Sequence, residues 1–147
     1  MYGRPKAIAG YGKIANMETN SLKQIVMLYD GAIKFLNLTA ADIEVNDIVA
    51  KCEHSNRALD IISYLQGILD FERGGSAAVS LDKLYTSINV LILRASSELD
   101  ANLMRRTADM LAPVRDAWET NAQLSINSTN KSATQNDHQS ATFNLAA

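Results

Sequence analysis

Three neighbouring side chains, Cys52, Glu53 and His54, are of types that bind metal ions or take part in catalysis. They lie in a segment with helical periodicity, where successive residues point in directions about 100° apart, so Cys52 and His54 do not converge on one ligand. The only other histidine is His138, and no glutamate is followed by a histidine three residues later, as a di-iron bundle requires. We therefore expect no enzyme activity, no metal and no cofactor.

One glycine-rich stretch, Gly10-Tyr11-Gly12-Lys13, is faintly similar to a phosphate-binding loop. It lacks the first glycine at the required distance, a Ser or Thr after the lysine, and a preceding strand. The charge distribution also argues against nucleic acid, because residues 18–123 carry ten basic and fifteen acidic side chains, whereas nucleic acids select a basic face. We expect neither a nucleotide nor a nucleic-acid partner.

Four long segments place apolar residues at every third or fourth position, which is the period of an α-helix. They cover residues 21–44, 48–71, 77–99 and 101–124. Similar lengths and short connections predict an all-α fold, an antiparallel up-down-up-down four-helix bundle. Asn20 or Ser21 is expected to cap the first helix and Asp47 the second, and Gly74–Gly75 to end the second. Pro113 predicts a kink or a restart in the fourth helix.

Two segments flank this bundle of residues 18–124. Residues 1–17 carry three basic and no acidic side chains, with Ile8, Tyr11, Ile14 and Met17 at three-residue spacing. Such a short amphipathic segment is held mainly by packing, so it is interpreted either as a permanent fifth helix or as a removable lid. Residues 125–147 are rich in Ser, Thr, Asn and Gln, which predicts a disordered polar tail.

The second helix is apolar on two adjacent strips, which is wider than a bundle core requires. The inner strip is predicted to consist of Ile48, Cys52, Ser55, Leu59, Ile62, Gln66 and Leu69. The outer strip is Ile61, Leu65 and Ile68. The outer strip is expected to pack against the N-terminal segment, a second copy of the chain or a ligand helix.

The expected location is the cytoplasm. No stretch approaches the ~20 apolar residues of a membrane-spanning helix, and the N-terminus lacks the apolar core of a signal peptide. A single cysteine excludes an internal disulfide and agrees with a reducing compartment. We expect a protein without membrane insertion that is a monomer or a weak homodimer.

Four strings in one colinear order carry a family resemblance over about residues 11–123. The first is Leu-Tyr-Asp-Gly-Ala-Ile at 28–33, and the second is Leu-Asp-x-x-x-Gly-Gly at 69–75. Leu84–Tyr85 and Arg-Asp-Ala-Trp at 115–118 follow, and Tyr11 matches an N-terminal tyrosine. Together they resemble the FliS family of flagellin export chaperones, in which the last string reads Arg-Glu-Ala-Trp.

The resemblance implies a helical bundle that binds the disordered C-terminal region of flagellin, prevents premature polymerisation and delivers it to the flagellar export apparatus, with no cofactor. Together with the apolar strips, it predicts a flagellin-binding groove and lid formed by Ile8, Tyr11, Ile14, Ile25, Tyr29, Gly31, Ile33, Ile61, Leu65 and Ile68. The alternatives are a helical adaptor for another flagellar client and a self-assembling structural helical subunit.

Two residues of the first string carry a physical expectation of their own. A glycine within a helix costs about 1 kcal/mol relative to alanine, so Gly31 indicates the close approach of another helix or of a ligand. Asp30 is expected to face water or to pair with an arginine.

Overall fold

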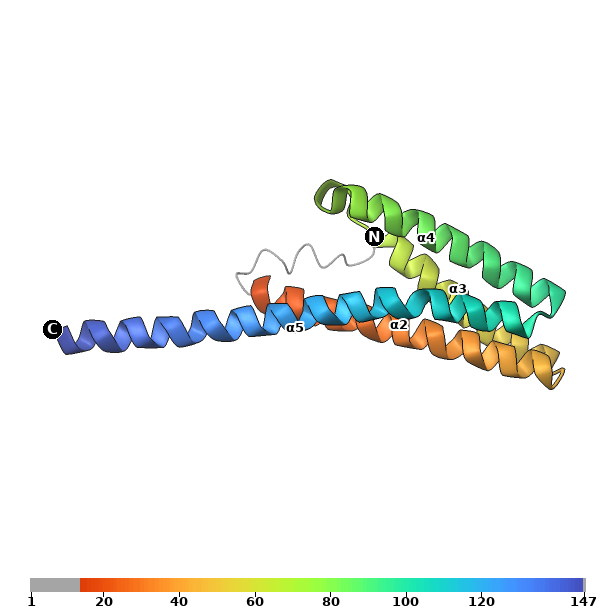
Figure 1. Cartoon of the computed structure of the whole chain (residues 1–147), viewed down its shortest axis with the longest axis horizontal. Helices are drawn as coiled ribbons and strands as arrows, with labels where there is room; N and C mark the ends of the chain where they lie inside the picture. The colour runs from red at the N-terminus through yellow and green to blue at the C-terminus, as the bar shows by residue number, and fades with distance from the viewer. Residues whose placement is uncertain (1–13, 147) are drawn as a thin grey trace. The chain divides into compact units, whose positions relative to one another are not determined.

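The computed structural model describes the backbone of residues 14–146 and the side chains of residues 21–128, 130 and 131. Over this range the chain forms α2 (Ile14–Glu44), α3 (Ile48–Gly67), α4 (Phe71–Glu98) and α5 (Ala101–Ala146), joined by short turns (Figure 1). Two compact units are present: residues 25–116, and residues 1–24 together with 117–147. In its described part, the latter unit consists of the first residues of α2 and the later residues of α5.

Within residues 25–116 the four helices form the predicted antiparallel bundle. Contacts between α3 and α4 show that these two helices run in opposite directions, because an early residue of one helix contacts a later residue of the other. Lys51 Nζ donates to the carbonyl oxygen of Ser96 at 3.0 Å, and Gln66 Nε2 donates to Asp82 Oδ1 at 2.9 Å. Consecutive helices joined by short turns therefore run up and down, as helices of similar length with short links do.

The core of this unit is a seam of buried side chains at three- and four-residue spacing. On α2 it consists of Val26, Tyr29, Ala32, Leu36 and Ala40. On α4 it consists of Ala78, Tyr85, Ile88, Ile92 and Ala95. Met104, Thr107, Ala108 and Leu111 continue the seam on α5. This spacing lets side chains of one helix fill the gaps of its neighbours, and it confirms the apolar stripe predicted for the first helix.

The buried face of α3 shares Ser55 and Ile62 with the predicted inner strip, and its other residues are shifted by one position. It consists of Lys51, Ser55, Ala58, Ile62 and Leu65. Cys52 is exposed, so its predicted place in the inner strip is wrong, and Leu65 lies in the core. A lysine occupies the core position because its aliphatic stem packs inside while its ammonium group reaches a backbone carbonyl.

Aspartate side chains cap the beginnings of three helices, since their carboxylates accept hydrogen bonds from amides that have no partner within the helix. Asp47 Oδ1 accepts from the amide of Ala50 at 3.1 Å, which confirms the predicted cap. Asp70 caps α4. Asp100 Oδ1 accepts from the amide of Leu103 at 2.9 Å.

Two helix boundaries differ from the prediction. The first helix begins at Ile14, so Asn20 and Ser21 lie inside it and do not cap it. The second helix ends at Gly67, and Gly74–Gly75 lies within α4. Asp70 explains the latter difference, because its cap starts a new helical turn before the glycines. Gly75 then interrupts that helix with φ 51° and ψ −127°.

The last helix runs without a break past Pro113, so of the predicted kink or restart the restart does not occur. Pro113 lies inside α5, and the helix does not restart there. The ring of Pro113 is exposed. The missing amide donor therefore falls on the solvent side of the helix. α5 then extends to Ala146 through the segment predicted as a disordered tail. The sequence after Pro113 contains no further glycine or proline that would end a helix.

Replacing Gly75 tests the interruption of α4. The positive φ of Gly75 is strained for any residue with a Cβ, so Gly75→Ala is expected to lower the free energy of unfolding by about 1–2 kcal/mol. Gly67→Ala is the matched control, because a Cβ there would meet no atom within 4 Å. Urea unfolding of both variants measures the difference, and equal midpoints would contradict the strained geometry of Gly75.

Candidate functional site

A single turn of α2, Tyr29-Asp30-Gly31, contacts all three of the other helices. The first of these contacts reaches α4. The hydroxyl oxygens of Tyr29 and Tyr85 lie 2.5 Å apart, both residues are buried, and their ring centroids are 6.3 Å apart. A buried hydroxyl requires a hydrogen-bond partner, so this pair joins α2 to α4 in one register.

The second contact reaches α5. Arg115 Nε donates to Asp30 Oδ1 at 2.8 Å, and Arg115 Nη1 lies 3.3 Å from Asp116 Oδ1. Of the two expectations for Asp30, facing water or pairing with an arginine, the structure shows the pairing. Because the Asp30 side chain is 53% exposed, solvent screens the pair and its contribution to stability is at most about 1 kcal/mol.

The third contact reaches α3. A Cβ added to Gly31 would lie 3.3 Å from Ile61 Cδ1, which is tighter than an ordinary van der Waals contact. The glycine therefore stands where another helix approaches closely, in agreement with the expectation from its position within a helix. The strings at 28–33, 84–85 and 115–118 thus meet in space, although they lie far apart in the sequence.

The environment of the tyrosine pair changes the acidity of one phenol. Burial, followed by the hydrogen bond with Tyr29, raises the pKa of Tyr85 well above its usual range. Both causes favour the neutral phenol, since the charged form would lose solvation inside the bundle. The pair is consequently a neutral structural contact and not a source of a reactive phenolate.

The residues predicted to form a binding groove fall into three groups. Tyr29 and Leu65 are buried in the core. Gly31, Ile25, Ile33 and Ile61 are partly exposed, and Ile68 is 47% exposed at the end of α3. The partly exposed residues belong to α2 and α3, which meet at Gly31 and Ile61. We call the surface of Ile25, Ile33, Ile61 and Ile68 the α2–α3 face.

The side chains predicted to form a lid lie outside the described side chains. Ile8 and Tyr11 lie outside the described residues. Ile14 is the first residue of α2, and its side chain lies outside the described side chains. The lid therefore stays a prediction.

Sequence reasoning missed several large apolar side chains that point outward. Among the described residues, they include Met27, Tyr64, Phe71, Val90 and Leu93, each of which is more than half exposed. Each lies off the buried seam of its helix. An apolar residue outside the main apolar stripe in the sequence could therefore have predicted an exposed side chain. They lie on three different elements, and apolar side chains exposed singly are normal on a protein surface.

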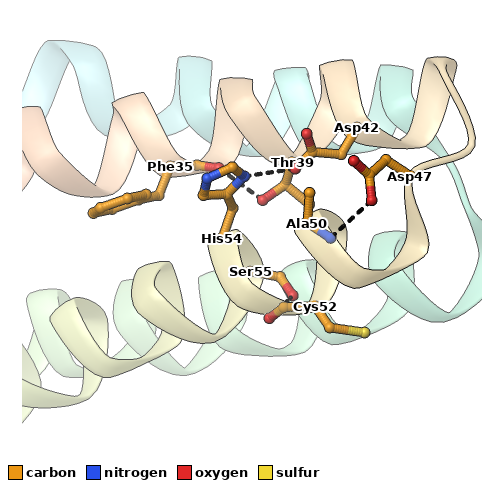
Figure 2. A network of polar contacts seen from close by, with 8 residues as sticks. All are labelled: Phe35, Thr39, Asp42, Asp47, Ala50, Cys52, His54 and Ser55. Carbon is orange, nitrogen blue, oxygen red and sulfur yellow. Dashed lines mark hydrogen bonds and ion pairs between the residues drawn. The ribbon is translucent and has the colours of Figure 1, made fainter.

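A polar cluster joins α2 to α3 near their connecting turn (Figure 2). His54 Nδ1 lies 2.6 Å from Asp42 Oδ2, and the imidazole stacks on Phe35. Figure 2 shows the Cys52 thiol pointing away from His54. Within the described side chains, no three His, Cys, Asp or Glu residues are grouped so that they could hold a metal ion.

The hydroxyls in this cluster are committed to the backbone. Thr39 Oγ1 donates to the carbonyl of Phe35 at 2.7 Å, and Ser55 Oγ donates to the carbonyl of Cys52 at 3.2 Å. The histidine–aspartate pair is thus not aligned with a nucleophile, as a catalytic triad would require. Its evident role is to hold two helices together.

An all-helical bundle with exposed apolar side chains on its outer surface is typical of a protein-binding module. No helix within the described residues is long and apolar enough to cross a membrane. A family model described as "Flagellar protein FliS" matches residues 5–125. The chain belongs to the FliS family.

Curated relatives agree with this assignment. The chain is 33% identical over 106 residues to the flagellar secretion chaperone FliS of Salmonella typhimurium, covering 71% of this chain and 78% of that protein. The corresponding Vibrio cholerae protein is 32% identical over 97 residues, covering 66% and 71%. The Bacillus subtilis protein is 29% identical over 94 residues, covering 64% and 69%.

Removing the buried hydroxyls tests the contact between α2 and α4. Tyr29→Phe and Tyr85→Phe are each expected to destabilise the protein by about 1–2 kcal/mol, because the remaining hydroxyl loses a partner in the core. The double variant is expected to cost less than the sum, with a coupling of about 1 kcal/mol. Urea unfolding measures all three, with exposed Tyr64→Phe as the control. Strict additivity would show that the hydroxyls do not interact.

The raised pKa of Tyr85 predicts a loss of stability at high pH. Below pH about 10, the ordinary pKa of tyrosine, both folded and unfolded phenols are neutral. Above it the unfolded phenol ionises while the folded one stays protonated, so stability falls as pH rises. Urea midpoints should therefore fall more steeply for the natural chain than for Tyr85→Phe. Parallel pH profiles for the two proteins would contradict this expectation.

Proposed function

We propose that this protein is a cytoplasmic export chaperone that binds the disordered C-terminal region of flagellin and assists its delivery to the flagellar export apparatus. It acts by binding alone, without catalysis or a cofactor, and it masks a segment that would otherwise polymerise too early. The observation that carries the proposal is the family match over residues 5–125, together with relatives whose names state flagellar secretion chaperone.

The α2–α3 face is the proposed contact surface for the client. Ile25, Ile33 and Ile61 are partly exposed and Ile68 is 47% exposed, so they offer apolar area without unfolding the bundle. Tyr29, Gly31 and Leu65 support this surface from beneath, since the tyrosine and the leucine are buried and the glycine touches Ile61. An amphipathic segment docks onto such a surface with its apolar residues inward.

Binding of a disordered client orders it, so the affinity reflects a large buried area offset by the entropy of ordering. We further propose that Ile8, Tyr11 and Ile14 form a lid that leaves the α2–α3 face when flagellin enters. The amphipathic spacing and the basic charge of residues 1–17 support the lid, because a weakly held segment can be displaced.

Isothermal titration with a peptide of the flagellin C-terminal region tests the proposal. A one-to-one complex with a large negative heat-capacity change is expected, because apolar surface is buried. Ile68→Ser should weaken this complex about tenfold, since it removes an exposed apolar side chain from the proposed contact. Removal of residues 1–17 should change the affinity if the lid covers the same surface.

Val90→Ser is the matched control, because Val90 is similarly exposed but lies on α4. Circular dichroism confirms that both variants keep their helices. No binding by the natural chain would overturn the flagellin assignment. Equal weakening by Ile68→Ser and Val90→Ser would overturn the α2–α3 face as the contact surface.

A further inference from the structure

Four exposed apolar side chains lie at the end of the bundle that carries the α2–α3 and α4–α5 turns. Val45 and Val49 are 75% and 72% exposed, the highest values among the large apolar side chains that are described. Ile48 and Leu99 are 42% and 45% exposed. We call Val45, Ile48, Val49 and Leu99 the turn-end patch. None of them belongs to the α2–α3 face.

The two turns lie at the same end of the bundle, on the right in Figure 1. The hydrogen bond from Lys51 to the carbonyl of Ser96 fixes α3 and α4 at one level. Ile48 precedes Lys51 by three residues and Leu99 follows Ser96 by three. Because the helices are antiparallel, both residues lie one turn further toward the same end.

Polar contacts hold this end in place. Arg105 forms a two-pronged ion pair with Glu44, with Nη1 donating to Oε2 at 3.0 Å, and this pair joins α5 to α2. Asp47 and Asp100 cap the helices that follow the two turns. The patch is therefore presented by fixed helix ends, which lowers the ordering cost for a partner that docks there.

The backbone at Leu99 ends α4 and sets the direction of the turn into α5. Leu99 adopts φ 54° and ψ 44°, the left-handed conformation that glycine accepts more easily. Its side chain is 45% exposed, so burial compensates little of this strain. The amides of Leu99 and Asp100 both donate to the carbonyl of Ala95, so this conformation caps α4 while the Leu99 side chain stays partly exposed.

Charge identifies the kind of partner. Residues 44–50 and 96–104 carry four carboxylates and no Lys, Arg or His. Arg105 and Arg94 pair with Glu44 and Glu98, and Lys51, four positions after Asp47, donates to the carbonyl of Ser96. Among the described residues, no ion pair is found for the cap residues Asp47 and Asp100. An acidic rim disfavours nucleic acid, an anionic membrane and the same end of a second copy, since each would bring like charges together.

We propose that the turn-end patch is a second protein-docking surface, which takes an apolar helical segment flanked by Lys or Arg from a partner other than flagellin. Apolar side chains of the partner cover Val45, Ile48, Val49 and Leu99, and its basic residues face Asp47 and Asp100. The surface lies on side chains separate from the α2–α3 face, so both can be occupied on one chain. The inference does not depend on flagellin binding.

Cys52 provides a reporter for the test, because it is the only cysteine, is exposed and lies about one helical turn from Val49. The full chain is labelled there with an environment-sensitive dye. It is then titrated with a helical peptide that has leucines on one face and lysines on the other. A twin peptide with glutamate in place of every lysine is titrated in parallel.

The Lys peptide is expected to bind at least about tenfold more tightly than its Glu twin. Val45→Ser with Val49→Ser should weaken the Lys peptide about tenfold, whereas Val90→Ser with Leu93→Ser, at positions 58% and 56% exposed on α4, should leave it within about twofold. Circular dichroism checks that both double variants remain folded. Equal binding of the two peptides, or equal effects of the two double variants, would overturn the proposal.

Discussion

One helical turn, Tyr29-Asp30-Gly31, determines how the bundle is assembled, because each residue of the turn contacts a different helix. The tyrosine shares a buried hydrogen bond with Tyr85, the aspartate pairs with Arg115, and the glycine lets Ile61 approach. These contacts differ in strength. The buried hydroxyl pair matters most, since a single hydroxyl left without a partner costs about 1–3 kcal/mol, whereas the half-exposed ion pair is screened.

The distribution of side-chain sizes links this core to binding. Small residues such as Ala32, Ala40, Ala58 and Ala95 fill much of the buried seam and let the helices pack closely. Several larger apolar residues consequently remain on the surface, Met27, Val90 and Leu93 among them. The bundle therefore carries apolar side chains both in its core and on its surface.

The helix ends are organised by short polar contacts that leave the surface free. Asp47 and Asp100 bind backbone amides at the start of α3 and α5, and Lys51 reaches a carbonyl near the end of α4. Each contact satisfies a backbone group that a helix end would otherwise leave without a partner.

By itself the sequence determined the four helices, the antiparallel bundle and the Asp47 cap, because periodicity and short turns are local properties. The tertiary structure decided that Asp30 pairs with an arginine, since Arg115 lies 85 residues away along the chain. Only the tertiary structure decided that Lys51 and not Cys52 faces the core, and that Leu65 is buried while Ile68 is exposed. Adjacent apolar positions on a helix are equivalent in a periodic pattern. Which of them is covered depends on where neighbouring helices approach, and that is set by contacts between residues far apart in the chain.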